Sequence, residues 1–563
     1  MDDFTIATSR GHLTIAEALD TDHDMIPTLL SGQQNDKFKD ELERRRSDIE
    51  KLIQRHLRIP QSQIMLSQRS DWIQGSFNIC LPVRITNTRS SRLPRQVIIR
   101  FVLPHGVGEP FSPGNVDEKI RCEAATYVWL HQTHPTIPIP RLFGMGVPGF
   151  TSIENESWWN WTIWHLRRSL AWPHGKTLSP YFAHRREALT DLGYLLIEHV
   201  VEGKMLSSSF KASRHDGNRR ANLYRGLARI MLRLASVPLP RIGSWTMDDR
   251  GIVSLTNRPL LDLTLFFGKH QIPTDIPRNM TYTSAQPFIH DKFAYQENRM
   301  RHQPNSILSK ADGIGQLSAL ANLRRLQSRF WDQRSCGGPF VLTLPDMHQS
   351  NIFVDDDWNV TSLIDLEFAP VAPVQIWKVP VWLSDRGVDQ IERPDFDEYQ
   401  SLYNEFVSAI EREEEAGGQD NTYSSKLRQD WSTGNFWYST ALGSIDAYPA
   451  IFDQHLQQKL DDADKVTLTQ FCGEDVSEFI EKKLEDFRRY EERIHEIFEE
   501  AKAREGVGSR AGDMLEGAEA REDEVKKVKK TFEEAEACEG LGEWRGGEEG
   551  RKDGQFTDCD SGA

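Results

Sequence analysis

The sequence of 563 residues predicts a mixed α+β fold, in which a strand-rich part precedes a larger helical part. Short apolar runs bounded by turn residues, such as RQVIIRFVL (95–103), predict strands in the first part. Longer segments with helical spacing, such as ANLYRGLARIMLRLASV (221–237), dominate from about residue 201. Two more strand-like runs interrupt the helical part within TLPDMHQSNIFVDDDWNVTSLIDLEFAP (343–370), and polar side chains stand at their ends.

The composition favours a soluble protein that binds neither nucleic acid nor membranes. A net charge of −16 disfavours wholesale attraction to nucleic acid or anionic lipid. The sequence contains no apolar run long enough to cross a bilayer and no recognisable signal peptide. Its six cysteines are scattered without a CxxC pair, which predicts neither a disulfide framework nor a zinc site. We therefore expect a cytoplasmic protein, and the composition leaves its oligomeric state open.

The expected elements follow in order from an N-terminal extension, residues 1–64, whose segment 35–57 has the apolar spacing of a helix. A strand-rich part, residues 65–200, contains DWIQGSFNICLPVRI and RQVIIRFVL as strands. The segment VDEKIRCEAATYVWLHQTH follows as a helix, and YLLIEHV as a buried strand. An insert at 151–186, rich in Trp and Arg, interrupts this part, and a helical part spans 201–474.

The last segment, residues 475–563, is expected to be a charged helix followed by a disordered tail. From about residue 505 the chain is rich in Gly, Glu and Lys and poor in large apolar residues, so it cannot bury enough surface to offset its ordering entropy. We predict that truncation at Glu505 changes the melting temperature by little. A fall of many degrees in a thermal melt would contradict this prediction.

Three polar residues at the ends of short apolar runs form the candidate site. FVLTL and NIFVD are expected as strands joined by the loop PDMHQS, and DDDW as the turn into a third strand, WNVTSLI. Such a hairpin returns Asp365 to the neighbourhood of Asn351, and Asp346 lies on the same loop. A lone aspartate in a loop is most often a turn former or a helix cap. Three such groups in this order favour a functional site.

The residue types at these three positions suit phosphoryl transfer. An amide and a carboxylate are hard oxygen ligands of the kind that magnesium accepts, usually together with phosphate oxygens. A further carboxylate, free of metal, can accept a proton from a substrate hydroxyl. Phosphoryl transfer depends on such positioning and on charge neutralisation. Asp346 is therefore the candidate base, and Asn351 and Asp365 are the candidate metal ligands.

The segment resembles the catalytic loop of the aminoglycoside phosphotransferase and choline kinase type of small-molecule kinases, most closely in the form found in fungal proteins. The order and spacing of Asp346, Asn351 and Asp365 match that family, and His348 is similar to its DxHxxN pattern. Ile364-Asp365-Leu366-Glu367 is similar to its IDWE. The resemblance covers about residues 65–440. It implies a protein kinase-like two-lobe fold with a small β-rich N-lobe and a larger helical C-lobe, and it implies ATP and Mg²⁺ as cofactors.

The resemblance also implies roles for residues upstream. The turn at Gly75, Ser76 and Phe77 matches the loop that covers the phosphates, and an ordinary hairpin is the alternative. Arg100 stands where the family has a phosphate-gripping lysine, and Glu123 matches the glutamate that pairs with it. The simpler alternatives are an exposed arginine on an edge strand and a solvated helix face. LLIEHVVEG resembles the hinge that contacts adenine, mainly through backbone groups near three residues: Glu198, His199 and Val200.

Two departures from the family pattern leave the activity open. Leu344-Pro345 replaces the usual His-Gly before the catalytic aspartate, and proline removes an amide donor. Arg100 keeps the charge of the usual lysine but not its geometry. The favoured interpretation is an ATP- and magnesium-dependent phosphotransferase acting on a hydroxyl of a small molecule. The alternatives are a catalytically inactive pseudokinase that binds nucleotide or acts as a scaffold, and an interaction module formed by the 151–186 insert and the helical tail. The acceptor is not readable from the sequence.

Overall fold

The computed structural model describes residues 4–8, 11–86, 93–154, 162, 164, 166, 177–185, 188–392, 395–418, 420–459 and 476–504. Residues Met1–His495 form one compact unit. Its described part begins with a hairpin of β1 (Ile6–Thr8) and β2 (Gly11–Leu13), followed by α1 (Ile15–Leu19). The sequence did not predict this hairpin, because strands of three residues are too short to show alternation.

The helix predicted over residues 35–57 is two helices in the structure. α2 covers Ile26–Arg44, α3 covers Arg46–Leu57, and Arg45 separates them with a φ of −95° and a ψ of 13°. α2 begins earlier than its apolar spacing indicated, and Pro27 in its first turn is compatible with a helix start. α3 buries an apolar face that includes Ile49 and Ile53 against the strand-rich part.

The strand-rich part is built on one antiparallel sheet, which has eight strands within the described residues. Its order is β10-β8-β7-β11-β6-β5-β3, and β4 also pairs with β5. β6 lies between β5 and β11, so the middle of this strand is covered on both edges. The strands are β3 (Ile64–Leu66), β4 (Ile73–Gln74), β5 (Asn78–Ile85), β6 (Gln96–Val102), β7 (Leu142–Val147), β8 (Phe150–Glu154), β10 (Tyr181–Arg185) and β11 (Tyr194–Glu198).

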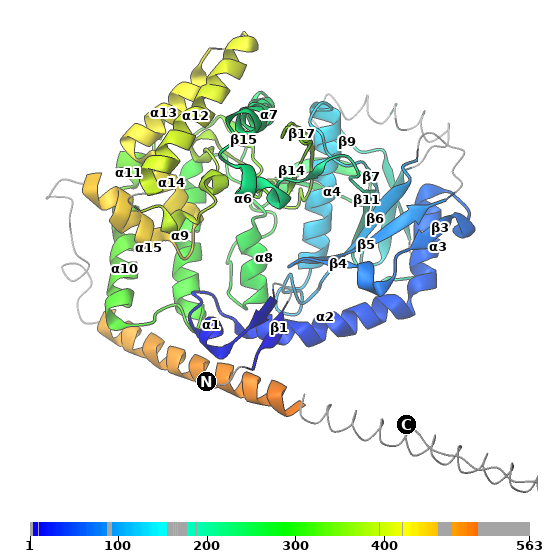
Figure 1. Cartoon of the computed structure of the whole chain (residues 1–563), viewed down its shortest axis with the longest axis horizontal. Coiled ribbons are helices and arrows are strands. Elements are labelled where there is room, and N and C mark those ends of the chain that lie inside the picture. The colour runs from blue at the N-terminus through cyan, green and yellow to red at the C-terminus, as the bar shows by residue number, and fades with distance from the viewer. Residues whose placement is uncertain are drawn as a thin grey trace, which may run out of the picture. The chain divides into compact units, whose positions relative to one another are not determined.

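The helix predicted after the strands now seen as β5 and β6 is α4 (Asn115–Thr133), which packs against β7 and β13. Fourteen of its residues are buried, including the charged Glu118, Lys119 and Glu123. A helix that is buried nearly all round shows only a weak apolar stripe in its sequence. Figure 1 shows the strands of the sheet on one side of α4 and helices α12 to α14 on the other.

The helical part confirms the α+β class predicted from the sequence, since helices surround a few short strand pairs. A single large apolar core extends from α4 through α7, α9 and α12. The helices are α6 (Phe210–Ser213), α7 (Gly217–Ala235), α8 (Asp262–Lys269), α9 (Ala285–His302), α10 (Lys310–Arg325), α11 (Gln327–Phe330), α12 (Asp395–Ala416), α13 (Thr422–Thr433), α14 (Asn435–Gly443) and α15 (Tyr448–Ile451). The strands are β12 (Lys204–Met205), β13 (Ser244–Met247), β14 (Ile252–Asn257), β15 (Phe340–Leu342), β16 (Ile352–Val354), β17 (Val360–Leu363) and β18 (Val371–Pro373).

The insert predicted at 151–186 contributes strands at both of its ends. β8 and β10 extend the main sheet, and β9 (Thr177–Leu178) pairs with β14. Most of the Trp-rich middle of the insert lies outside the described residues. Residues 476–504 form the predicted charged helix, and the tail from residue 505 also lies outside the description. None of the helices in the described ranges is long and apolar enough to cross a membrane.

Candidate active site

The loop between β15 and β16 carries Asp346 and is held by a chain of backbone hydrogen bonds. The N–H of Met347 donates to the Leu344 carbonyl at 3.1 Å, and that of His348 to the Asp346 carbonyl at 2.8 Å. The N–H of Asn351 then donates to the His348 carbonyl at 2.8 Å. The Trp382 indole N–H also donates to the Met347 carbonyl at 2.8 Å. The Leu344 side chain packs against the large core. Packing and these hydrogen bonds therefore brace the loop at the place where the family pattern has a histidine.

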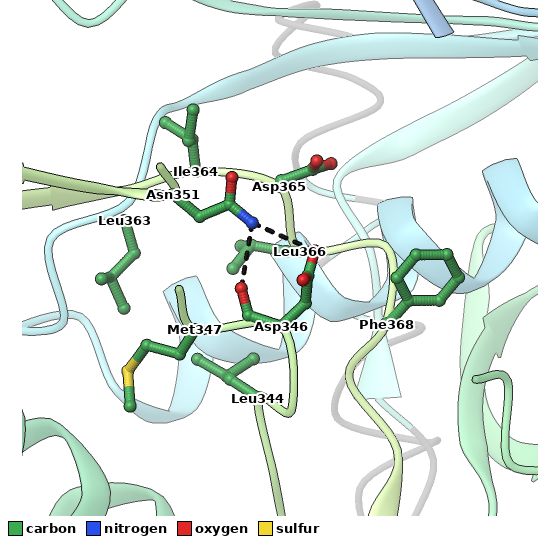
Figure 2. A pocket seen from close by; sticks show the side chains of 9 residues that line it. All are labelled: Leu344, Asp346, Met347, Asn351, Leu363, Ile364, Asp365, Leu366 and Phe368. Atoms are coloured by element: carbon green, nitrogen blue, oxygen red, sulfur yellow. Dashed lines mark hydrogen bonds between the residues drawn. The ribbon is translucent and has the colours of Figure 1, made fainter. Parts of the chain in front are cut away.

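Asn351 lies directly before β16 and binds the candidate base. Its side-chain N–H₂ donates to the Asp346 carbonyl at 2.9 Å and to the Asp346 carboxylate at 3.0 Å. The amide oxygen of Asn351 consequently points away from Asp346 (Figure 2). The sequence predicted that these two residues lie on one loop, and in the structure they are in direct contact.

Asp365 follows β17, and the β16–β17 hairpin returns it to Asn351 as the sequence predicted. The N–H of Ile364 donates to the Asn351 carbonyl at 3.0 Å, which ties the two strand ends together. Asp365 has a φ of 62°, in the left-handed region that aspartate tolerates better than most residues. Its carboxylate therefore turns out of the strand direction, and the side chain retains 29% exposure.

Asp346, Asn351 and Asp365 line one small pocket, between the loop that precedes β16 and the loop that follows β17. Figure 2 shows Asp346 and Asp365 on different loops, with the amide nitrogen of Asn351 directed toward Asp346. The remaining walls are apolar: Leu344, Met347, Leu363, Ile364, Leu366 and Phe368. Two acidic side chains in a mostly apolar setting are favourable only when a cation or a proton accompanies them.

Arg100 joins this pocket to the sheet and to α4. From the middle of β6 its guanidinium contacts the Asp365 carboxylate at 3.0 Å and both oxygens of Glu123 at 2.6 Å. It also donates to the Glu367 carboxylate at 3.1 Å. Its side chain is only 7% exposed, so it is not an arginine on a solvated edge. The predicted pairing of Arg100 with Glu123 is present in the structure.

Sequence reasoning missed a second cation in this cluster, Lys119. Its fully buried ammonium contacts the carboxylate of Glu367, lies 3.5 Å from that of Glu123, and donates to the Asn78 amide oxygen at 2.9 Å. The Asn78 amide N–H₂ donates in turn to Glu367 at 2.9 Å. The available signal was the four-residue spacing of Lys119 and Glu123, which places both on one face of a helix. For Glu367 the sequence indicates only its place in the motif Ile364-Asp365-Leu366-Glu367.

The cluster has one negative charge in excess. Three carboxylates, those of Asp365, Glu123 and Glu367, face two cations, Arg100 and Lys119. Burial opposes the ionisation of Glu367, but the Lys119 ammonium, together with the Arg100 guanidinium, outweighs it and lowers the pKa of Glu367. Burial and the nearby Glu367 raise the pKa of Asp365 to about 7. Asp365, the member of the cluster that lines the pocket, is therefore the carboxylate that the excess negative charge disposes to take up a proton or a cation.

The Asp346 carboxylate is also shifted. Burial and the neighbouring Asp365 raise the pKa of Asp346 to about 7, while its hydrogen bond from Asn351 acts in the opposite direction. A carboxylate with a raised pKa is a stronger base than an ordinary aspartate. Such perturbed groups cluster at functional sites.

We predict that Lys119→Met destabilises the protein by about 3–5 kcal/mol, because it leaves the Glu367 carboxylate buried without its nearest cation. Urea unfolding of the purified variant measures this loss. Lys204→Met is the matched control, since Lys204 forms an exposed pair with Asp356 at 3.4 Å and should leave the free energy of unfolding almost unchanged. Equal effects of the two substitutions would contradict the importance of the buried cluster.

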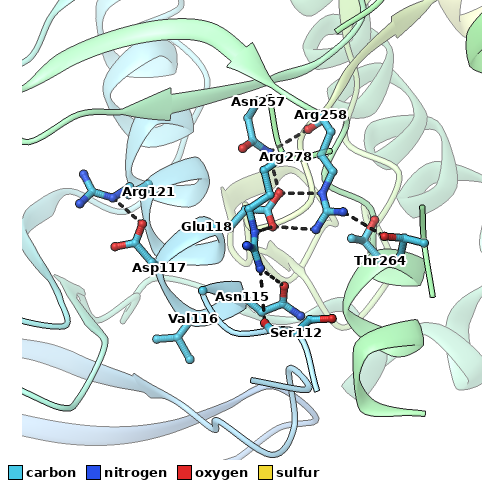
Figure 3. A network of polar contacts seen from close by, with 12 residues as sticks. Ser112, Asn115, Val116, Asp117, Glu118, Arg121, Asn257, Arg258, Thr264 and Arg278 are labelled. Carbon is cyan, nitrogen blue, oxygen red and sulfur yellow. Dashed lines mark hydrogen bonds and ion pairs between the residues drawn. The ribbon is translucent and has the colours of Figure 1, made fainter. Parts of the chain in front are cut away.

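A second buried network holds α4, the helix that carries Lys119 and Glu123. The Glu118 carboxylate accepts from Arg258 at 2.9 and 2.8 Å, from Arg278 at 2.9 Å and from the Asn257 amide at 2.9 Å. Arg278 also donates to the Asn115 side chain at 2.9 Å. Figure 3 shows Asn257, at the end of β14, and Arg258 and Arg278, from the segment that follows it, directed at Glu118 in the first turns of α4. Glu118 thus positions the helix on which two members of the charge cluster stand.

The predicted phosphate-covering loop lies beside the pocket. Residues 75–77 join β4 to β5, and the N–H of Gly75 donates to the Asn78 carbonyl at 2.9 Å. Gly75 and Ser76 are exposed. Phe77 packs edge-on against Phe368, with ring centroids 5.6 Å apart, and Phe368 lines the pocket. The contact between Phe77 and Phe368 therefore places this turn beside the pocket that Asp365 also lines.

The predicted hinge follows β11, which ends at Glu198. The backbone N–H of Glu198 donates to the Arg141 carbonyl at 2.8 Å, and that of His199 to the Gln96 carbonyl at 3.3 Å. The His199 ring nitrogen Nδ1 also lies 2.7 Å from the Gln96 side-chain oxygen. These two amide donors are engaged within the protein. The prediction of an adenine contact therefore rests on Val200 and on carbonyl groups of the segment.

The donor set at the pocket fits a magnesium ion. Magnesium is typically held by one or two carboxylates and completes its shell with phosphate oxygens and water. The Asp365 carboxylate and the Asn351 amide oxygen supply such ligands. Among the described residues there is no cluster of three or more His, Cys, Asp or Glu side chains that could hold a metal ion without other ligands. Phosphate oxygens would thus be needed to complete the shell.

The sequence profile of the phosphotransferase enzyme family matches residues 82–376, more than half of the chain. The matched range includes Arg100, Glu123, Asp346, Asn351 and Asp365. No curated protein matches the chain at a significant level.

Proposed function

Because this chain belongs to the phosphotransferase enzyme family, whose fold is kinase-like, we propose that it transfers the γ-phosphoryl group of ATP to a hydroxyl of a small molecule in a magnesium-dependent reaction. The observation that carries the proposal is the pocket in which Asn351 binds Asp346 while Asp365 approaches from the next strand. A base, an amide oxygen and a second carboxylate are the parts that phosphoryl transfer requires.

The bonds and the proton that change in the proposed step belong to the two substrates and to Asp346. The acceptor oxygen forms a bond to the γ-phosphorus, and the bond between that phosphorus and the bridging oxygen of ADP breaks. The acceptor proton passes to the Asp346 carboxylate, and ADP leaves with the bond electrons. Magnesium, when bound by Asn351 and Asp365, neutralises charge on the phosphate oxygens.

The remaining site residues hold the nucleotide in this proposal. The turn at Gly75, Ser76 and Phe77 covers the phosphates, with the backbone N–H groups of Ser76 and Phe77 as donors, because the Gly75 N–H is engaged by the Asn78 carbonyl. Arg100 is kept in place by Glu123 and reaches the phosphates from the side of Asp365. The hinge near Val200 contacts adenine.

Nucleotide binding and hydrolysis by the full chain test the proposal together. We expect ATP to raise the melting temperature only when magnesium is present, and we expect slow ATP hydrolysis without an acceptor. ATP stabilisation that does not depend on magnesium would contradict the assigned metal ligands. A screen of alcohols, amino sugars and choline-like amines in the same melt then searches for the acceptor class.

An inactive, nucleotide-binding pseudokinase is the second candidate. The observation that favours it is Leu344-Pro345 in place of the usual His-Gly before Asp346. Binding of nucleotide without any turnover, in the presence of every acceptor class tested, would favour this candidate.

A further inference from the structure

Asn78 connects the turn at residues 75–77 to the segment that carries Asp365. Its backbone carbonyl accepts from the Gly75 N–H at 2.9 Å, which closes the turn. Its side-chain N–H₂ donates at 2.9 Å to the carboxylate of Glu367, two residues after Asp365. Both side chains are buried, so water does not compete for this hydrogen bond. A single residue therefore links two segments that lie far apart in the sequence.

A pair of aromatic rings supports this link from the neighbouring positions. The Phe77 ring packs edge-on against the Phe368 ring, with centroids 5.6 Å apart. Phe77 directly precedes Asn78 in the sequence. Phe368 directly follows Glu367, so adjacent residues of one segment contact adjacent residues of the other. Two such contacts fix the orientation of the segments as well as their separation. We call the two contacts, Asn78–Glu367 and Phe77–Phe368, the clamp.

The buried Lys119 ammonium fixes the direction of the Asn78 amide. It donates to the Asn78 amide oxygen at 2.9 Å and also contacts the Glu367 carboxylate. Because an ammonium only donates, the amide oxygen has to face it, and the N–H₂ group is left to face Glu367. The polar contact of the clamp is therefore held in one arrangement.

We propose that the clamp positions the turn at residues 75–77 relative to Asp365, which makes Asn78 and Glu367 positioning residues of the phosphotransferase reaction. The inference rests on the proposed function and deepens it. In that function the turn binds phosphate oxygens through N–H groups, and Asp365 binds the magnesium ion whose shell those oxygens complete. Both sets of contacts form on one phosphate chain only while the turn and Asp365 keep their separation. An exposed turn without such a tie opens independently of the core.

The ATP affinities of Asn78→Ala and of a matched control test the proposal on the full chain. The control is Asn257→Ala, because the Asn257 side chain also donates at 2.9 Å to a buried carboxylate, that of Glu118, which two arginines hold. Both variants should have a lower melting temperature than the parent protein. Calorimetry at a magnesium concentration that saturates the parent protein should show ATP binding weakened about tenfold in Asn78→Ala, the equivalent of one hydrogen bond to a charged group, and unchanged in Asn257→Ala. Equal ATP affinities in the two variants would overturn the proposal.

Phe77→Leu tests the second contact of the clamp in a variant that keeps all the buried charges. It removes the edge-on pair of rings and should weaken ATP binding about threefold. If Asn78→Ala does not fold, Phe77→Leu decides alone, and an ATP affinity equal to that of the parent protein would overturn the proposal.

A double-variant cycle with Asp365→Asn distinguishes the clamp from a local effect on the turn. Asn78→Ala should weaken ATP binding by a smaller factor in the Asp365→Asn background than in the parent protein, because the metal contact that the clamp serves is already impaired there. The same factor in both backgrounds would overturn the positioning role. If the parent protein does not bind ATP with magnesium, the proposed function fails and the clamp fails with it. If the parent protein and Asn78→Ala bind ATP equally well, only the clamp fails.

Discussion

Asp346→Asn is expected to reduce turnover by between about a hundredfold and ten-thousandfold, the range that a general base contributes. An amide does not accept the hydroxyl proton, but its oxygen can still accept the hydrogen bond from Asn351 that now reaches the carboxylate at 3.0 Å. The loop should therefore keep its shape, and nucleotide binding should remain nearly intact. Steady-state rates of phosphoryl transfer or ATP hydrolysis, compared with nucleotide titrations, measure the two effects separately.

The control is the same substitution on the hairpin that follows the Asp346 loop. Asp355 lies in the turn between β16 and β17, where its carboxylate accepts from Asn359 at 2.8 and 2.9 Å. Asp355→Asn should leave the rate unchanged. Full activity in the Asp346 variant would remove the base from the proposed reaction, and an equal loss in both variants would indicate a damaged hairpin instead.

Asp346→Asn should also change how stability depends on pH. Burial and Asp365 raise the pKa of Asp346 to about 7, above the value of about 3.9 in an unfolded chain. The folded state therefore binds this proton more tightly than the unfolded state, and stability falls as pH rises between these two values. The asparagine variant carries no such group. Its melting temperature, relative to the parent protein without ligand, should rise from pH 5 to pH 8. A difference that stays constant over this range would contradict the raised pKa.

The catalytic loop was predictable because its signal is local. Asp346, Asn351 and Asp365 follow short apolar runs at spacings that a hairpin converts directly into proximity. The pairing of Arg100 with Glu123 was predicted from the family resemblance, which implies a cation in this strand and a glutamate in the helix that follows. In each case the sequence neighbours of the residue already define the element on which it stands.

Lys119 and Asn78 were not predictable, because their partners are distant in the sequence. In the sequence, Lys119 has the pattern of a residue on a solvated helix face. Only the fold brings Glu367, from the segment after β17, into contact with it. The break between α2 and α3 at Arg45 was missed since no proline or glycine marks it. Charged residues buried in a cluster look like surface residues in a sequence, and only tertiary packing distinguishes the two.

Asp365→Ala is expected to raise the magnesium concentration needed for ATP binding by roughly tenfold or more, since it removes the charged ligand from a cation held by one or two carboxylates. Stabilisation by ATP in a thermal melt should shrink with it, because a ligand stabilises in proportion to the logarithm of its saturation. Asn351→Ala should shift the magnesium midpoint in the same direction by less, because an amide oxygen carries no net charge. Melts over a magnesium series, with and without ATP, provide both midpoints.

The charge balance of the cluster makes the Asp365 result diagnostic. Without Asp365, Glu123 and Glu367 are matched by Arg100 and Lys119, so the ligand-free cluster becomes neutral. Removing the excess charge should favour the fold, whereas alanine at a φ of 62° should strain the backbone. Asp365→Asn separates these effects, because asparagine tolerates this φ and lacks the charge. It should raise the magnesium midpoint without lowering the ligand-free melting temperature. If Asp365 only shaped the turn, asparagine would leave the magnesium midpoint unchanged. That result would contradict the assignment of Asp365 as a metal ligand.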